Sequence, residues 1–417
     1  MSYQVPRGTQ DILPQDISKW HRLEDLIRQF CYVYNFEEIR TPIFEHTNVF
    51  KRGNDSSDMV NKEMYTFKLE NSSTSLTLRP EGTAGVVRSF VEHKLYGQPD
   101  LPLKTYYVGP QFRHERPQKG RMRIFNQFGV EVLGAKDPLI DVEAIALGWS
   151  FVSALGLSDL KVLINTLGDD ESRNAYRAAL RDHFSGSIST MCPDCQRRYE
   201  QNPLRILDCK IDHDLDIIKS APKMSDYLNE ASKEYFDAVK QGLDALGIPY
   251  EIDDRLVRGL DYYTKTIFEI LNDDFTVCGG GRYDGLVEQL GGPKGISGIG
   301  FGLGAERLLL TLENNNIEIE NPKATDIYIA TIGDKAKTKS FGLVKSLRDN
   351  HISTDIDHLG KSLKAQFKYS DKINAKYTIV IGDDELDKDL ATLKNMATSE
   401  QTTVKLSELV NELKNRL

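Results

Sequence analysis

Residues 112–125, FRHERPQKGRMRIF, carry five cations within an eleven-residue loop. Cations this close repel one another unless they face an anion. A solvated hairpin turn is the ordinary interpretation of a charged loop, but here the flanking segments are apolar and Phe125 follows the last cation closely. Because a guanidinium binds a phosphate through two parallel hydrogen bonds, the loop predicts an anion or nucleotide site. Its cations are Arg113, Arg116, Lys119, Arg121 and Arg123.

A second candidate site lies in LVRGLDYYTKTIFEI, residues 256–270. The end of this segment alternates between apolar and polar residues, as a half-buried strand does. Its beginning is too polar for a strand interior, because it holds Arg258, Gly259 and the adjacent Tyr262 and Tyr263. A strand tyrosine is usually a core residue with a satisfied hydroxyl group. The residue types alone leave open what requires a cation, a tight turn and two aromatic rings in one place.

Glycines alternate through GIGFGLGAERLLLTL, residues 298–312, and leave one face of the predicted strand bare. A planar ligand can approach such a face closely, and Arg307 follows in the first turn of a predicted helix. A dinucleotide-binding loop does not fit, because no βαβ unit follows the glycines. The GKS triplet at residues 360–362 is not a phosphate loop either, because Asp355 stands where the first glycine is required.

Polar residues in two otherwise apolar segments are further candidates. TLRPEGTAGVVR places Glu81 and Thr83 at a predicted strand-to-helix turn, where capping of the helix by Thr83 is the alternative. In NQFGVEVLG, Gln127 and Glu131 share one face of a predicted strand. Both need partners, because burying these groups without hydrogen bonds is costly.

Three of the five cysteines form the pattern C-x2-C-x13-C-x3-H with a histidine. This spacing is compatible with a closed structural zinc site. Reduced cysteines in a small helical insertion are the alternative. An odd number of cysteines in a long chain is typical of a reducing compartment, so a cytoplasmic location is expected. The four residues are Cys192, Cys195, Cys209 and His213.

The elements that position these sites follow from periodicity. Helical spacing of apolar residues predicts a helix over 17–34, and strand-like alternation in the first half predicts an antiparallel sheet. The polar segment 169–235 is expected to form a helical insertion. From residue 325 strands and helices alternate, which predicts a separate α/β domain. The predicted domains are therefore 1–324 and 325–417, an α+β arrangement with an α/β C-terminal part.

Composition excludes several classes of protein. Hydrophobic residues make up 40% and charged residues 28% of the chain, as in globular proteins. No apolar run approaches the length that spans a bilayer, and the beginning of the chain lacks the pattern of a secretory signal. A net charge of −9 argues against nucleic-acid binding through bulk charge, so any such contact must rest on a local site.

Together these segments resemble the class II aminoacyl-tRNA synthetases. IRTPIFE, FRHERPQKGRMRIFNQFGVEV and GIGFGLGAERLL are similar to motifs one, two and three of that class. LVRGLDYYTKTIFE and GGGRYDGL resemble the two histidine motifs of the histidyl-tRNA synthetase family, and PRGTQDILP and TLRPEGT also match it. The resemblance covers essentially the whole chain in the expected order.

The resemblance implies a role for each candidate residue. Arg113 and Arg258 would contact the reacting α-phosphate and carboxylate, and Phe125 would stack on adenine. The ATP-binding residues would be Arg113, Glu115, Arg121, Phe125 and Arg307. The histidine-binding residues would be Glu81, Thr83, Arg113, Gln127, Glu131, Arg258, Tyr262, Tyr263 and Tyr283. Arg116 and Gln118 are candidates for the acceptor stem of the tRNA.

The implied reaction activates L-histidine with ATP to histidyl-adenylate and pyrophosphate, and then transfers histidine to the 3′ end of the tRNA for histidine. Mg²⁺ is expected with ATP, a homodimer is expected through motif one, and no membrane partner is expected. The C-terminal domain would bind the anticodon. A regulatory subunit of histidine biosynthesis is one alternative, although such relatives typically lack the C-terminal domain and catalytic residues. An RNA-binding or stress-sensing module is another.

Overall fold

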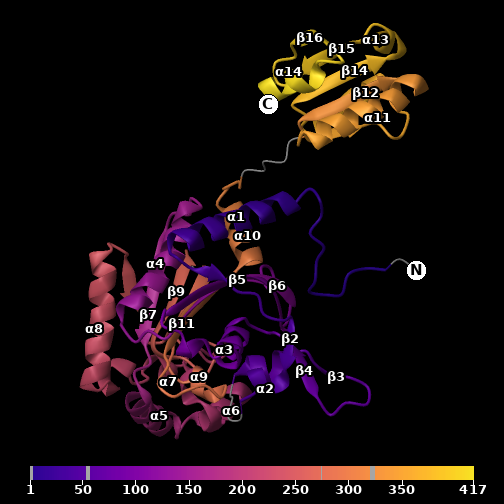
Figure 1. Cartoon of the computed structure of the whole chain (residues 1–417). Coiled ribbons are helices and arrows are strands. Elements are labelled where there is room, and N and C mark those ends of the chain that lie inside the picture. Colours follow the sequence, from indigo (N-terminus) through magenta and orange to yellow (C-terminus); the bar gives the residue numbers. More distant parts are fainter. Residues whose placement is uncertain (1–2, 53–56, 274, 320–324) are drawn as a thin grey trace. The chain divides into compact units, whose positions relative to one another are not determined.

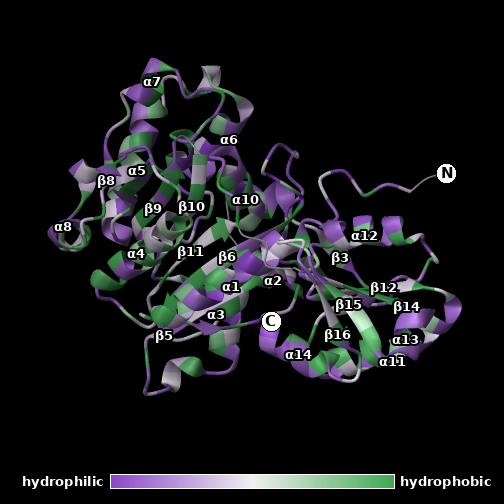
Figure 2. Cartoon of the chain, turned by 90° about the horizontal axis from the view of Figure 1, so that it is seen from above, coloured by the Kyte–Doolittle hydropathy of each residue, from purple (hydrophilic) through white to green (hydrophobic). Residues whose placement is uncertain are grey.

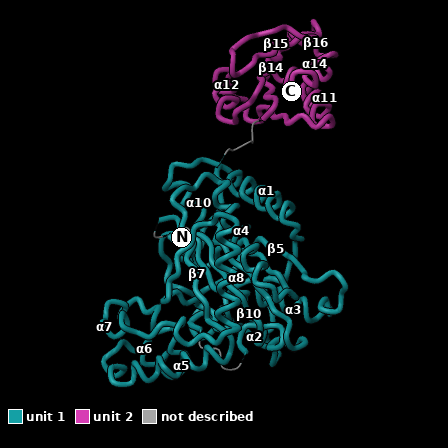
Figure 3. The backbone as a smooth tube through the Cα atoms, turned by 90° about the vertical axis from the view of Figure 1, so that its left-hand side faces the viewer, with its two compact units in different colours: residues 1–319 teal, residues 320–417 magenta. Residues whose placement is uncertain are grey.

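The computed structural model describes residues 3–52, 57–273, 275–319 and 325–417. The chain divides into two compact units, residues 1–319 and 320–417 (Figures 1 and 3). The domain boundary expected after residue 324 falls at the edge of a segment outside the described residues.

The first unit is built on an eight-stranded sheet with the order β1-β5-β6-β11-β10-β9-β7-β8. Neighbouring strands from β5 to β7 pair antiparallel, whereas the edge strands β1 and β8 pair in parallel with β5 and β7. The predicted antiparallel sheet is therefore confirmed. The strands are β1 (Glu37–Glu38), β5 (Leu103–Phe112), β6 (Ile124–Leu133), β7 (Leu160–Thr166), β8 (Tyr250–Ile252), β9 (Thr264–Asn272), β10 (Phe275–Tyr283) and β11 (Gly298–Gly304).

One face of this sheet is covered by helices and forms an apolar core. Successive residues of a strand point to opposite faces, and Phe128 and Val130 of β6 are fully buried in this core together with Phe301 of β11. Helix α1 buries Leu23 and Ile27 against it. The helices that contribute are α1 (Ile17–Val33), α4 (Leu139–Ala154), α8 (Glu230–Ala245) and α10 (Ala305–Asn314).

The opposite face of the sheet carries the polar residues of β6, covered by α3 (Thr83–Glu92) and by the segment between β7 and α8. That segment is helical. Asp169 starts its first helix by accepting a hydrogen bond from the Ser172 backbone N–H at 2.9 Å, and Pro193 occupies the first turn of its second. Its helices before α8 are α5 (Asp170–Phe184), α6 (Pro193–Gln201) and α7 (Asp216–Lys219).

A second, small antiparallel sheet has the strand order β2-β4-β3. Its strands come before α3 in the sequence. Its strands are β2 (Phe44–His46), β3 (Thr66–Lys68) and β4 (Ser75–Leu78). The turn after β4 carries Glu81 and leads directly into α3, so this sheet fixes the place at which the helix begins.

The second unit has a five-stranded sheet of order β13-β12-β14-β15-β16. Strands β13, β12 and β14 are parallel, as the α/β prediction requires, whereas β14, β15 and β16 form antiparallel pairs that the sequence did not indicate. Helices α11 and α14 are amphipathic, with mixed hydrophobic and hydrophilic colouring (Figure 2). The elements are β12 (Ile327–Ile332), α11 (Asp334–Asp349), β13 (Thr354–Ile356), α12 (Leu363–Lys372), β14 (Tyr377–Gly382), α13 (Asp383–Asp387), β15 (Leu390–Asn395), β16 (Gln401–Lys405) and α14 (Leu409–Arg416). None of the described helices is long and apolar enough to cross a membrane.

Candidate active site

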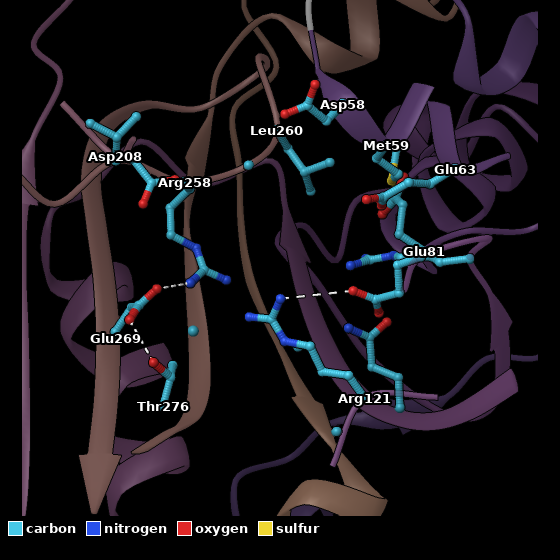
Figure 4. Close-up of a pocket in the computed structure, with 18 of the residues that line it drawn as sticks. Asp58, Met59, Glu63, Glu81, Arg121, Asp208, Arg258, Leu260, Glu269 and Thr276 are labelled. Carbon is cyan, nitrogen blue, oxygen red and sulfur yellow. Dashed lines mark hydrogen bonds and ion pairs between the residues drawn. The ribbon is translucent and has the colours of Figure 1, made fainter. Parts of the chain in front are cut away.

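A cavity of about 680 Å³ opens on the polar face of the eight-stranded sheet. Its walls come from β6, β9, β10 and β11, the basic loop, the turn before α3 and the helical segment between β7 and β8. Figure 4 shows Arg121 pointing into the cavity between Glu81 and the pair formed by Arg258 and Glu269. The predicted residues that line the cavity are Glu81, Thr83, Arg113, Glu115, Arg121, Phe125, Gln127, Arg258, Tyr262, Tyr263, Tyr283 and Arg307.

Glu131 is placed differently from the prediction. It lies behind the wall of the cavity, 1% exposed, and its carboxylate accepts hydrogen bonds from Thr83 Oγ1 at 2.6 Å and from the Tyr283 hydroxyl at 2.5 Å. Burial raises its pKa to about 8. Both oxygens are thus engaged by two residues that do line the cavity, and Glu131 holds them in place.

Glu81 begins helix α3 and faces the cavity at the same time. Its Oε1 accepts the Ala84 backbone N–H at 3.0 Å, and its Oε2 accepts the Tyr262 hydroxyl at 3.5 Å. Capping by Thr83 is therefore wrong, because Thr83 is already the first helical residue and its hydroxyl points to Glu131. The carboxylate of Glu81 is available to an ammonium group in the cavity.

The glycines of β11 make room for side chains of the neighbouring strands. A Cβ atom on Gly300 would lie 2.1 Å from Glu131 Oε2, and one on Gly302 would lie 2.1 Å from Gln127 Nε2. A Cβ on Gly298 would lie 2.1 Å from the Tyr283 ring. Gly300, Gly302 and Gly304 line the cavity as the predicted bare face of β11, and the side chains of Glu131 and Gln127 use the space that their missing Cβ atoms leave.

Arg258 is held at the cavity by an acidic residue that sequence reasoning missed. Its NH1 forms an ion pair with Glu269, whose other oxygen accepts the Thr276 hydroxyl at 2.9 Å (Figure 4). Burial disfavours the charged form of Arg258, but Glu269 outweighs burial and raises the pKa of the guanidinium. Glu269 stands between the buried residues Phe268 and Ile270. A carboxylate in an apolar strand needs a partner, as was argued for Glu131, and the same argument could have identified Glu269 from the sequence.

The space for the Arg258 guanidinium is provided by Gly279 of β10. A Cβ atom at this position would lie 2.7 Å from Arg258 NH1. Among the described residues, Arg258 Nε has no hydrogen-bond partner. This buried donor is therefore available to a ligand.

The cations of the basic loop separate into two groups. Arg113 donates through Nε to the Pro80 carbonyl at 2.8 Å and lies 5.2 Å from the centre of the Phe125 ring. Arg121 lies 3.8 Å from Glu115. Arg113, Phe125, Arg121 and Glu115 line the cavity. The remaining cations, Arg116, Lys119 and Arg123, do not.

Arg307, in the first turn of α10, completes the basic part of the cavity. Its guanidinium lies 4.5 Å from the centre of the Phe275 ring. Burial, together with the nearby Arg121, lowers its pKa. Its Nε also has no partner among the residues that the structure describes.

The acceptor-stem candidates lie outside the cavity. Gln118 and Arg121 exchange two backbone hydrogen bonds, of 3.1 and 2.8 Å, and close the tip of the basic loop. Arg116 and Gln118 are exposed on this tip.

The predicted zinc ligands are partly confirmed as a spatial group. Cys192, Cys195 and Cys209 come together, but the fourth member of the group is Asp212. His213 does not belong to this group. Its Nδ1 lies 3.0 Å from the Lys210 carbonyl oxygen and its exposed ring turns towards Asp214.

A family model described as Histidyl-tRNA synthetase matches residues 8–308, and one described as Anticodon binding domain matches residues 326–416. The chain is 56% identical over 422 residues to the Histidine--tRNA ligase of Clostridioides difficile (strain 630), with 100% of each chain covered. It is 53% identical over 424 residues to that of Geobacillus sp. (strain WCH70), again with 100% of each covered.

The crystal structure of apo S. aureus histidyl-tRNA synthetase is similar over 99% of this chain and 100% of its own, with a TM-score of 0.84 and 46% identity. Identity at this level extends the likeness beyond the fold. The chain therefore belongs to the histidyl-tRNA synthetase family of class II aminoacyl-tRNA synthetases, the histidine–tRNA ligases.

Proposed function

We propose that this cavity catalyses both steps of histidine ligation to tRNA. The observation that carries the proposal is Arg258, whose Nε has no partner among the described residues and which is oriented by Glu269 in the cavity that also holds Glu81 and Phe125. An oriented cation in a cavity stabilises negative charge that develops during a reaction.

Histidine would bind between α3 and strand β10. The carboxylate of Glu81 and the hydroxyl of Thr83 suit its ammonium group. The side chains of Gln127, Tyr263 and Tyr283 offer hydrogen bonds to the imidazole ring. A pocket that hydrogen-bonds a ligand strongly rejects analogues that lack the bonding groups, because its own polar groups are then left unpaired.

ATP would bind at the basic part of the cavity. Phe125 offers an aromatic face to adenine. Arg113 and Arg258 would contact the α-phosphate and the histidine carboxylate, with Arg121 and Glu115 beside them. Arg307 would contact the γ-phosphate, and its unpartnered Nε, judged over the described residues, supports this role.

Mg²⁺ fits the donors present. Glu63 and Glu115 line the cavity near Arg113, and magnesium typically binds one or two carboxylates together with the phosphates of a nucleotide. When bound, the ion would neutralise charge on the departing pyrophosphate.

In the first step an oxygen of the histidine carboxylate attacks the α-phosphorus, and the bond to pyrophosphate breaks. Arg258 stabilises the charge on the α-phosphate during this exchange. In the second step a hydroxyl at the 3′ end of the tRNA attacks the carbonyl of the adenylate, and AMP leaves. Glu81 and Thr83 keep the ammonium group, and hence the carbonyl carbon, in the same position in both steps.

The tRNA would contact both units. Arg116 and Gln118 on the exposed tip of the basic loop would meet the acceptor stem. The domain from residue 325 onwards would bind the anticodon, which the match of residues 326–416 to an anticodon-binding model supports. Domains 1–324 and 325–417 are thus the proposed catalytic and anticodon-binding parts.

A homodimer is part of the proposal. Apolar side chains are exposed at the end of α1 and at β2, the region of motif one: Tyr32 is 84% exposed, Val33 76% and Phe44 51%. In a homodimer formed through this region these side chains would be removed from water. Sedimentation of the Phe44→Asp variant would test it, with a shift to the monomer expected. The five cysteines are free thiols, which supports a cytoplasmic location.

The experiment that tests the function is exchange of labelled pyrophosphate into ATP. We expect exchange with histidine alone among the amino acids, and a decrease in rate of about 10²- to 10³-fold in the Arg258→Ala variant. The control is Arg116→Ala, which should keep the exchange rate and lose charging of tRNA. No exchange in the unaltered chain, with histidine still bound, would reject the proposal.

A further inference from the structure

We propose that Cys192, Cys195, Cys209 and Asp212 bind one Zn²⁺ ion that fixes a wall of the active-site cavity. Each residue offers one ligand atom, and the four atoms all lie within 4.8 Å of one another. Three thiolates and one carboxylate are ligands that zinc accepts in closed four-coordinate sites.

The distances between the ligand atoms agree with a tetrahedral metal site. Cys192 Sγ lies 3.7 Å from Cys209 Sγ, and Cys209 Sγ lies 3.8 Å from Asp212 Oδ2. Zinc–sulfur bonds of about 2.3 Å in a tetrahedron place two sulfurs about 3.8 Å apart. A disulfide requires about 2.05 Å, so the two sulfurs are not bonded to each other, and their separation is compatible with coordination of one ion.

Local structure orients the ligands before any metal arrives. Cys192 is the N-cap of α6 and Cys195 lies in the first turn of that helix, so the two thiols point the same way. The Cys192 backbone N–H donates to Asp212 Oδ2 at 2.9 Å, and the Asp212 backbone N–H donates to Cys209 Sγ at 3.4 Å. Hydrogen bonds to the ligands are a regular part of metal sites, because they hold the ligands in position.

The charge of the group also calls for a cation. Asp212 is 8% exposed and Cys195 and Cys209 are buried, yet Asp212 forms no ion pair within the described part of the chain. The nearby Arg198 is already engaged by Asp58 Oδ2 at 2.8 Å and by the Arg205 carbonyl at 3.0 Å. Burying a carboxylate without a countercharge is costly, and a divalent ion removes this cost.

The position of the site gives it a structural role in catalysis. Cys192 and Cys209 line the cavity, as do Asp208 and Lys210 beside them. Zinc would join the beginning of α6 to the 208–212 turn. Helix α6 in turn binds Asp58, another cavity residue, through Arg197 at 2.7 Å. The ion would therefore hold the beginning of α6 and the 208–212 turn in fixed positions relative to one another, without contact to the substrates.

The test uses the full-length chain purified without chelators and measures zinc by mass spectrometry. We expect about one zinc per chain. The informative pair is Asp212→Ala and His213→Ala, two adjacent substitutions in one turn. Cys209→Ser and Asp212→Ala should lose zinc or release it at least tenfold faster to a chromogenic chelator, whereas His213→Ala should match the unaltered chain.

A second readout replaces zinc with Co²⁺, whose visible spectrum reports tetrahedral geometry and thiolate ligands. Zinc-free chain that takes up no Co²⁺ would overturn the proposal, as would a Cys192–Cys209 disulfide in chain purified under reducing conditions. Loss of metal from His213→Ala with retention in Asp212→Ala would overturn the ligand set. If Cys209→Ser does not fold, the metal content of the unaltered chain and the adjacent pair still decide the question.

Discussion

The two ends of the cavity differ in whether their polar side chains have hydrogen-bond partners. We call the part around Glu81, Thr83 and Tyr283 the amino-acid end and the part around Arg258 and Arg307 the phosphate end, after the proposed ligands. At the amino-acid end, polar groups bind one another: Thr83 and Tyr283 donate to Glu131, and Tyr262 donates to Glu81. At the phosphate end, buried donors of Arg258 and Arg307 have no partner among the described residues.

Under the proposed function, this difference separates selection of the amino acid from binding of ATP. A network with fixed hydrogen bonds holds one shape, so the amino-acid end can distinguish imidazole from other side chains. An unsatisfied buried donor costs about 1–3 kcal/mol, and an anion that accepts the hydrogen bond removes that cost. Under the proposed function, the phosphate end would therefore favour the triphosphate and the amino-acid end would exclude wrong ligands.

The largest effect is expected from filling the space at Gly300. A Cβ atom there would lie 2.1 Å from Glu131 Oε2 and 2.2 Å from the Val130 carbonyl oxygen. Gly300→Ala should lower the free energy of unfolding by about 3 kcal/mol and weaken histidine binding, as measured by urea denaturation and by the KM for histidine. In Gly304→Ala the new Cβ would meet Arg307 Cβ at 3.7 Å, an ordinary contact, so this variant is the control. Equal losses in both would contradict a prearranged amino-acid end.

An effect that is smaller per pH unit is expected from the proton on Glu131. Its pKa is raised to about 8 in the folded chain, whereas an unfolded glutamate titrates near about 4.3. Between these values the folded state binds more protons, so stability is full below the lower value and is lost as the pH rises through the upper one. The slope reaches at most about 1.4 kcal/mol per pH unit.

Glu131→Gln should flatten this part of the stability profile. The measurement is the urea midpoint of both chains between about pH 5 and 8, with Glu115→Gln, in the phosphate end, as the control. Parallel profiles for the Glu131 variant and the unaltered chain would mean that Glu131 is ionised throughout the range.

The smallest effect concerns adenine. Phe125→Leu keeps an apolar side chain but removes the aromatic face, which is worth about 1 kcal/mol. The KM for ATP should rise about fivefold, and the KM for histidine should stay unchanged in pyrophosphate exchange. An equal rise in both constants would show that the two ends are not independent.

Periodicity predicted much of this arrangement. Alternation in β6 correctly placed Gln127 and Glu131 on one face, because side-chain direction in a strand depends on position alone. What fills the space over a glycine depends on which strand lies beside it. The pairing of β11 with β6, and of Gly298 with Tyr283 in β10, arises from contacts far apart in the chain and was not available from the sequence.

The direction of a single side chain could not be predicted where it depends on the conformation of one turn, as for His213. Spacing favoured His213 as a fourth zinc ligand, because histidine is the commoner ligand. The 209–212 turn directs the Asp212 backbone N–H to Cys209 and turns the next residue outwards. At helix α3 the structure excludes only the alternative of capping by Thr83, since the carboxylate of Glu81 accepts the Ala84 N–H while the hydroxyl of Thr83 donates to Glu131.

Strand β6 has one apolar face and one polar face. In a mutational scan of the strand, the kind of defect should therefore alternate from one position to the next. Substitutions at the even positions Phe128 and Val130 would harm growth in ways that low temperature or a chaperone relieves, because they weaken the fold. Under the proposed function, substitutions at the odd position Gln127, which lines the cavity, would harm growth in ways that excess histidine relieves. The parity of a position in this one strand thus decides whether a substitution reaches the apolar core or the side of the strand that faces the cavity.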